Sequence, residues 1–183
     1  MNIKKIKKIR EGEFKSLLKN VPVAGDEEGI IKIYDRRFNL MGAEYWTAGF
    51  FNILDKIMKK GAVGILYNSG YEIGKIHFNW LKGIGIAAEE EFIGKYLGLL
   101  KFCGYGNINI ASFDENRVVI VAESSPDGIE YKHIYKKKRK VCHYLKGILD
   151  GFLSSLLKKE LTSEETKCVA AGDKCCEFVA KVK

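Results

Sequence analysis

The segment ETKCVAAGDKCCEF, residues 165–178, carries three of the five cysteines of this 183-residue chain and predicts how the chain ends. Gly172 and the aspartate after it are typical of a tight turn between antiparallel strands. The sequence therefore predicts a terminal hairpin with strands at about 161–170 and 175–182. Such a hairpin brings Cys168 close to one of the two adjacent cysteines on the second strand.

A metal site is one explanation for this clustering. Cys142 lies on a helix predicted before the hairpin, and together with Glu165 it could complete a four-ligand set that includes Cys168. A borderline-soft ion such as Zn²⁺ accepts thiolate and carboxylate ligands in a tetrahedron. In an ideal strand Glu165 and Cys168 point to opposite faces, so this site requires a bulge or bend between them. Plain packing of buried cysteines and a reactive thiol at Cys142 remain open as alternatives.

The rest of the chain predicts helices first and a sheet later. Helical spacing of apolar residues predicts four helices, at about 43–59, 62–81, 88–102 and 138–159. A short strand at 30–34 precedes them. Alternating patterns around a turn predict a second hairpin, with strands at 107–113 and 117–123. This order indicates one domain of the α+β class, with a mainly antiparallel sheet packed against several helices.

Two of the predicted helices have distinctive faces. Gly70 and Gly74 are one helical turn apart in the second helix, which indicates a closely packed helix neighbour rather than chemistry. The first helix carries one apolar face, made of Ala43, Trp46, Phe50, Leu54, Ile57 and Met58.

The chain is basic, with 31 Lys and Arg against 23 Asp and Glu and a formal net charge of +8. We interpret residues 1–28 as a basic N-terminal arm and 29–183 as the ligand- and zinc-binding domain. No apolar stretch of signal-peptide type follows the first residues, and the longest uncharged run, 102–113, is far short of the ~20 residues of a membrane-spanning helix. We therefore expect a cytoplasmic protein without a membrane span. The basic run KKKRK at 136–140 is most simply a solvated surface, so a nucleic-acid partner is not expected.

The order of Cys142, Glu165, Cys168, Gly172 and Cys176, followed by Phe178, resembles the zinc-binding end of the 4-vinyl reductase domain, which also serves as the sensory module of phenol-responsive bacterial transcription activators. The resemblance implies a structural zinc held by Cys142, Glu165, Cys168 and Cys176, with Cys175 as a bystander. It further implies a fold similar to that of the TRAPP vesicle-tethering subunits, and a homodimer.

The same resemblance implies a pocket for a small apolar or aromatic ligand near the zinc layer. Aromatic and apolar residues of the helices and strands around that layer are the candidates to line it: Phe92, Tyr96, Phe102, Val119, Val121 and Tyr144.

The expected function is that of a small-molecule binding or sensing module whose output passes through a protein partner. A reductase acting on a vinyl-bearing tetrapyrrole is the competing class, as the family name suggests. No convincing nicotinamide or flavin motif accompanies it, and a four-ligand site leaves no open metal position. An enzyme is therefore the less favoured interpretation. A scaffold similar to the TRAPP subunits is the third class.

Overall fold

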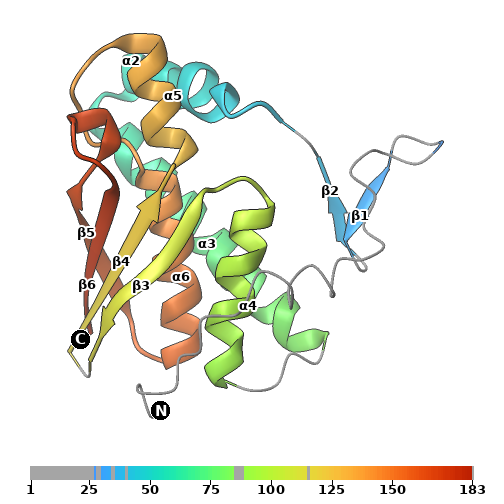
Figure 1. Ribbon diagram of the computed structural model, residues 1–183. Coiled ribbons are helices and arrows are strands. Elements are labelled where there is room, and N and C mark those ends of the chain that lie inside the picture. The colour runs from blue at the N-terminus through green and yellow to red at the C-terminus, as the bar shows by residue number, and fades with distance from the viewer. Residues whose placement is uncertain are drawn as a thin grey trace.

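The structure is a computed structural model that describes residues 27, 30–33, 36–39, 41–84, 89–114 and 116–182. Apart from residue 27, the predicted basic arm lies outside the described residues. The described part is an α+β domain in which helices cover one face of a four-stranded antiparallel sheet (Figure 1). This confirms the predicted fold class. No described helix is both long and apolar enough to cross a membrane.

The sheet has the order β3-β4-β6-β5, and every neighbouring pair is antiparallel. Its strands are β3 (Asn107–Phe113), β4 (Arg117–Glu123), β5 (Leu161–Lys167) and β6 (Cys176–Val182). Side chains alternate between the two faces of a strand. In β4, Val118, Ile120 and Ala122 are almost fully buried and belong to the core.

Three helices form the layer behind the sheet: α3 (Lys60–Gly83), α4 (Glu89–Phe102) and α6 (His143–Leu157). Helices α3 and α6 approach so closely that their backbones touch. A Cβ atom at Gly70 would overlap the Tyr144 carbonyl, and one at Gly151 would overlap the Tyr71 carbonyl. The close helix neighbour predicted for Gly70 and Gly74 is therefore α6, which contributes small residues of its own at this contact.

The elements before α3 differ from the prediction. The predicted first helix is a π-helical segment, η2 (Tyr45–Phe51), followed by α2 (Asn52–Met58). Its buried aromatic residue is Phe51, whereas Phe50, Ile57 and Met58 on the predicted apolar face are 44%, 74% and 46% exposed.

Two further elements lie at the ends of the domain. A small hairpin of β1 (Ile31–Ile33) and β2 (Arg36–Phe38) stands beside the body (Figure 1). Helix α5 (Pro126–Tyr135) occupies a stretch whose first residues had predicted only a turn. Pro126 stands in its first turn, where the missing N–H costs nothing. The chain after α5 is extended until Cys142, so α6 begins five residues later than predicted.

Candidate functional site

Four side chains from three parts of the chain meet at the end of the sheet nearest α5. Cys142 precedes α6, Glu165 lies in β5, Cys168 follows β5 and Cys176 begins β6. Each offers one ligand atom, and these atoms all lie within 4.8 Å of one another. The structure thus brings together the four residues that the resemblance implied as metal ligands.

A distortion in β5 makes this meeting possible. The register between β5 and β6 shifts between Glu165, which faces Phe178, and Lys167, which faces Glu177. The extra residue, Thr166, donates its hydroxyl to a Glu177 side-chain oxygen at 2.7 Å. This irregularity is the bulge that the four-ligand set required, because it lets Glu165 and Cys168 reach the same point.

The turn between Cys168 and Cys176 is held by local hydrogen bonds. The Cys168 amide donates to Asp173 Oδ2 at 2.9 Å, and the Asp173 amide donates back to the Cys168 carbonyl at 3.1 Å. A single 3-10 turn, η3 (Val169–Ala171), ends at Gly172, whose φ of 113° is one that side chains rarely tolerate. The Gly-Asp pair of the sequence therefore shapes the loop, although the connection is longer than a simple hairpin turn.

The cluster is buried and short of positive partners. Cys142, Cys168 and Cys176 are fully buried, and both carboxylate oxygens of Glu165 are buried without a hydrogen-bond partner among the described residues. The Cys142 sulfur lies 3.4 Å from that of Cys176 and 3.9 Å from that of Cys168. Burial raises the pKa of Glu165 to about 8, whereas hydrogen bonds from the Cys142 and Cys176 thiols lower the pKa of Cys168.

These observations fit a bound cation. Several acidic groups at one buried point do not ionise together unless a positive charge compensates them. A divalent ion that accepts sulfur and oxygen ligands would supply that charge and would satisfy the two orphaned Glu165 oxygens. The positive N-terminus of α6, which begins next to Cys142, adds to the compensation.

The remaining cysteines lie outside the four-ligand group. Cys175 is half-buried and Cys103 is exposed at the end of α4. The position of Cys175 agrees with its expected role as a bystander.

Arg139 connects the loop of the cluster to α2. Its amide donates to the Ala170 carbonyl in η3 at 3.3 Å. Its guanidinium forms a two-pronged ion pair with Asp55, at 2.6 and 2.8 Å, and lies 5.0 Å from the centre of the Phe51 ring. Sequence analysis missed this link, because nothing in a run of five basic residues distinguishes the one that folds inward.

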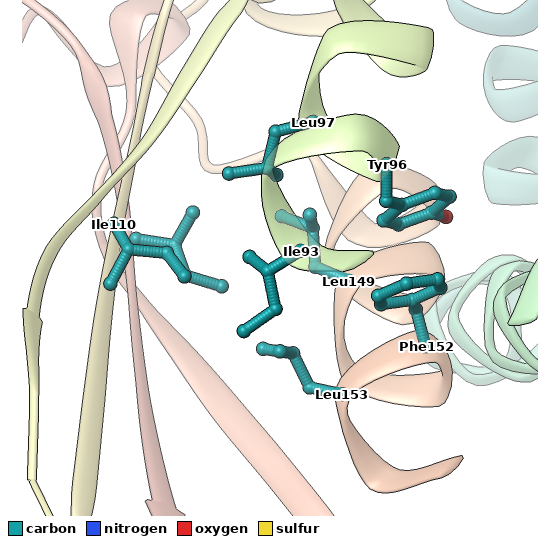
Figure 2. A pocket seen from close by; sticks show the side chains of 8 residues that line it. Ile93, Tyr96, Leu97, Ile110, Leu149, Phe152 and Leu153 are labelled. Carbon is teal, nitrogen blue, oxygen red and sulfur yellow. The ribbon is translucent and has the colours of Figure 1, made fainter. Parts of the chain in front are cut away.

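An apolar chamber lies between α4, α6 and the sheet (Figure 2). Ile93, Tyr96 and Leu97 of α4 face Phe152 and its neighbours on α6. The free volume is only about 10 Å³, roughly that of one water molecule. The Tyr96 and Phe152 rings stack with their centroids 3.6 Å apart and fill the space.

The structure places one of the six predicted ligand contacts in this lining, Tyr96. Phe92 is buried directly behind it and packs on Phe152, with ring centroids 5.7 Å apart. Phe102 is 45% exposed and lies outside the lining. Tyr144 is half-buried on α6 and is likewise outside.

Val119 and Val121 also lie outside the lining, because the alternation of β4 turns them away from the helices. Ile120, between them, lines the chamber. The signal that would have found the lining is the helical spacing of Leu149, Phe152 and Leu153 opposite Ile93 and its neighbours.

The chamber has one polar group at its edge. The Tyr96 hydroxyl lies 3.2 Å from His77 Nδ1 on α3. Burial, with a smaller contribution from Arg36, lowers the pKa of His77 to about 4. The imidazole is therefore neutral at pH 7 and can exchange a hydrogen bond with a hydroxyl group.

The fold and this site define a class: an α+β domain whose C-terminal helix and hairpin enclose a buried group of three cysteines and one glutamate. Residues 123–182 match the family model of the 4-vinyl reductase domain, and the four residues of the cluster all lie within that segment. The match confirms the resemblance that the cysteine and glutamate spacing indicated.

Two uncharacterized proteins of Methanocaldococcus jannaschii are similar to this chain, with 24% identity over 123 residues and 25% over 130 residues. The alignments cover 67% and 71% of this chain but only 66% and 62% of the two relatives. This chain therefore spans less than two thirds of the length of each.

Solved structures support the fold. The sensory domain of the phenol-responsive transcription activator PoxR, solved with phenol, has a TM-score of 0.80 at 19% identity, covering 93% of this chain and 89% of that domain. A vinyl-4-reductase family protein of M. jannaschii has a TM-score of 0.58 at 21% identity, covering 80% and 84%. Subunit 3 of the trafficking protein particle complex from Naegleria fowleri, bound to palmitic acid, has a TM-score of 0.55 at 15% identity, covering 77% and 95%. These likenesses confirm the predicted relation to both fold types.

Proposed function

We propose that this chain is a zinc-containing module of the 4-vinyl reductase type that binds or senses a small apolar or aromatic molecule, and that it acts as a cytoplasmic homodimer through a protein partner. The observation that carries the proposal is the buried group of Cys142, Glu165, Cys168 and Cys176, whose ligand atoms lie within 4.8 Å of one another inside the segment that matches the family model.

The zinc has a structural role in this proposal. Cys142 belongs to the start of α6 and the other three ligands belong to the terminal hairpin, so the ion cross-links the helix to two strands of the sheet. Four protein ligands complete a tetrahedral zinc site and leave no position for substrate. The ion therefore fixes the end of the domain next to the chamber and carries out no reaction.

The chamber between α4 and α6 is the proposed ligand site. Its apolar lining suits an aromatic ring, and His77 with the Tyr96 hydroxyl could hold a polar substituent at its edge. The present volume admits only a water-sized probe, so ligand entry requires the stacked rings of Tyr96 and Phe152 to separate. Ligand binding and movement of α4 against α6 are thus coupled in this proposal.

Native mass spectrometry of the full chain tests these elements together, because it reports zinc, a retained ligand and the dimer in one spectrum. We expect one zinc per chain. Phenol, chosen because it occupies the PoxR sensory domain, serves as the first binding probe. We expect Tyr96→Ala to change phenol affinity, because it enlarges the chamber, and Phe102→Ala, at an exposed aromatic of the same helix, to leave it unchanged. Zinc without any binding of phenol or of a larger arene such as indole would reject the sensing part alone.

The small cavity favours a second candidate, a scaffold. A chamber of about 10 Å³ is a filled core, which suits a domain that works through its surface. The same spectra separate the two functions. A dimer with zinc but with no retained or added ligand supports the scaffold, whereas a ligand of defined mass supports the sensing module.

A further inference from the structure

A second cavity lies away from the apolar chamber, where α2 meets α3. This junction cleft has a volume of about 480 Å³ and is lined by Asp55, Lys59, Lys60, Val63 and Arg139. Such a volume is within the range of small-molecule sites in proteins. Three of its five lining residues carry a positive charge at neutral pH, and one carries a negative charge.

The single carboxylate of the junction cleft is already neutralised. Asp55 accepts two hydrogen bonds from the Arg139 guanidinium, at 2.6 and 2.8 Å. The Arg139 hydrogen bond holds the pKa of Asp55 below its usual value, so Asp55 is ionised at neutral pH and matched charge for charge by Arg139. The net charge of the cleft therefore comes from the other two cations.

Lys59 and Lys60 supply that charge. Both are exposed, and within the described part of the chain neither ammonium group has a carboxylate partner. Lys137 adds to the positive field, because its charge also lowers the pKa of Asp55. Two ammonium groups without counter-ions thus stand beside a guanidinium of fixed position.

The geometry of the junction cleft is fixed from two sides. The chain bends sharply at Lys59, where φ is 49° and ψ is −118°, so that two consecutive lysines line one cleft. On the other side, Arg139 is held by Asp55, by the Phe51 ring and by the Ala170 carbonyl. A pre-positioned guanidinium loses less conformational entropy when it contacts a ligand than a free one does.

We propose that the junction cleft binds a phosphate monoester. A dianionic phosphate matches the two unpaired ammonium groups, whereas a carboxylate would match only one of them. The outer N–H groups of Arg139 provide further donors for phosphate oxygens. The volume exceeds that of a phosphate group alone, so the rest of the ligand lies against Val63 and the methylene stems of the lysines.

The test follows the backbone amide signals of the isotope-labelled full chain during a titration with glycerol phosphate, at an ionic strength held constant with sodium chloride. We expect saturable shifts at Lys59, Lys60 and Arg139. The double variant Lys59→Gln/Lys60→Gln should bind about ten-fold more weakly, because each lost charge-assisted hydrogen bond costs affinity.

The matched control is Lys158→Gln/Lys159→Gln. Lys158 also has a positive φ, 54°, and is followed by a second exposed lysine, so this pair reproduces the local backbone and charge change at a distant place. This variant should bind as the unmodified chain does. Shifts that grow without saturation, or equal weakening in both double variants, would overturn the proposal.

A second arm separates a soluble phosphate monoester from a lipid headgroup. Co-sedimentation with phosphatidylcholine vesicles containing phosphatidic acid, lost in Lys59→Gln/Lys60→Gln, would assign the phosphate to a lipid. Saturable binding of glycerol phosphate without vesicle binding would assign it to a soluble molecule. Absence of both would refute the site.

Discussion

Two buried carboxylates, Glu165 and Asp150, contain every buried side-chain N or O atom that lacks a hydrogen-bond partner in the described part of the chain. Their surroundings differ. Glu165 faces three sulfur atoms and fits a cation site. Asp150 faces hydrogen-bond donors: the Tyr67 hydroxyl at 3.0 Å, the Ser163 amide at 2.8 Å and the Ser163 hydroxyl at 3.0 Å, all directed to Oδ2.

Replacement of one proposed ligand tests the cluster at the scale of a single sulfur. We expect Cys168→Ser to lose zinc and to lower Tm by roughly 10 °C, because structural zinc contributes several kcal/mol to folding and one kcal/mol corresponds to about 2 to 4 °C in a domain of this size. Native mass spectrometry and a thermal melt measure the two effects. Cys175→Ser, outside the four-ligand group, should keep the zinc and the Tm. A Cys168→Ser protein that keeps both would contradict the metal site.

Asp150 predicts a pH dependence of stability. Burial raises its pKa from 3.8 to about 6. A carboxyl group whose pKa is higher in the folded state stabilises the fold at low pH, and this stabilisation disappears as pH rises from about 4 through 6. For a shift of this size the free energy of unfolding should fall by about 3 kcal/mol across that window.

The Asp150→Asn variant isolates this contribution. Asparagine keeps one acceptor oxygen for the donors from Tyr67 and Ser163 and has no charge to bury. Urea unfolding at pH 4 and pH 7 should show that the variant gains stability relative to the unmodified chain as pH rises. An equal difference at the two pH values would exclude Asp150 as the cause.

At the scale of elements, the contact between α3 and α6 depends on glycine. We expect Gly151→Ala to lower the free energy of unfolding by about 1 to 3 kcal/mol or more, because its methyl group would overlap the Tyr71 backbone. Gly64→Ala, in the same helix as Tyr71 but with open space around it, should instead raise it by about 0.5 to 1 kcal/mol. Urea unfolding compares the two, and destabilisation of equal size would show that helix propensity, not the contact, decides.

The sequence predicted those elements whose signal is local. Apolar spacing located α3 and α4, and alternation located β3 and β4 to the residue. Helix α5 was missed because its start, Pro126-Asp-Gly, is also typical of a turn. The face of η2 and α2 was wrong because a π-helix accommodates more residues per turn than the 3.6 assumed. This change of phase buries Phe51 and exposes Phe50 and Ile57.

The two candidate sites differ in the same way. Three of the four residues in the cysteine cluster lie in one hairpin, so short spacings were enough to bring them together. The chamber depends on which faces of α4, α6 and β4 point inward, and these elements are far apart in the chain. Its lining therefore could not be obtained from the aromatic residues one element at a time.

At the scale of the whole molecule, Arg139 joins the cysteine cluster to the surface of α2. We expect Asp55→Asn to accelerate amide hydrogen exchange in α2, because the helix has no buried residue of its own and loses the ion pair that ties it to the loop. Exchange mass spectrometry of β3, which does not contact this pair, provides the internal reference. Equal exchange of α2 in both proteins would show that Arg139 does not hold it.

The glycine contact has a further consequence for the longest helix. With 24 residues, α3 is about 36 Å long, from the junction cleft at Lys60 to Trp80, where Arg36 and Phe38 of the small hairpin pack. Backbone contact at Gly70 and Gly74 prevents its middle from rotating or bending away from α6 independently. The two helices therefore behave as one rigid lever. A torque applied at the cleft end reaches the hairpin end as rotation of both helices together.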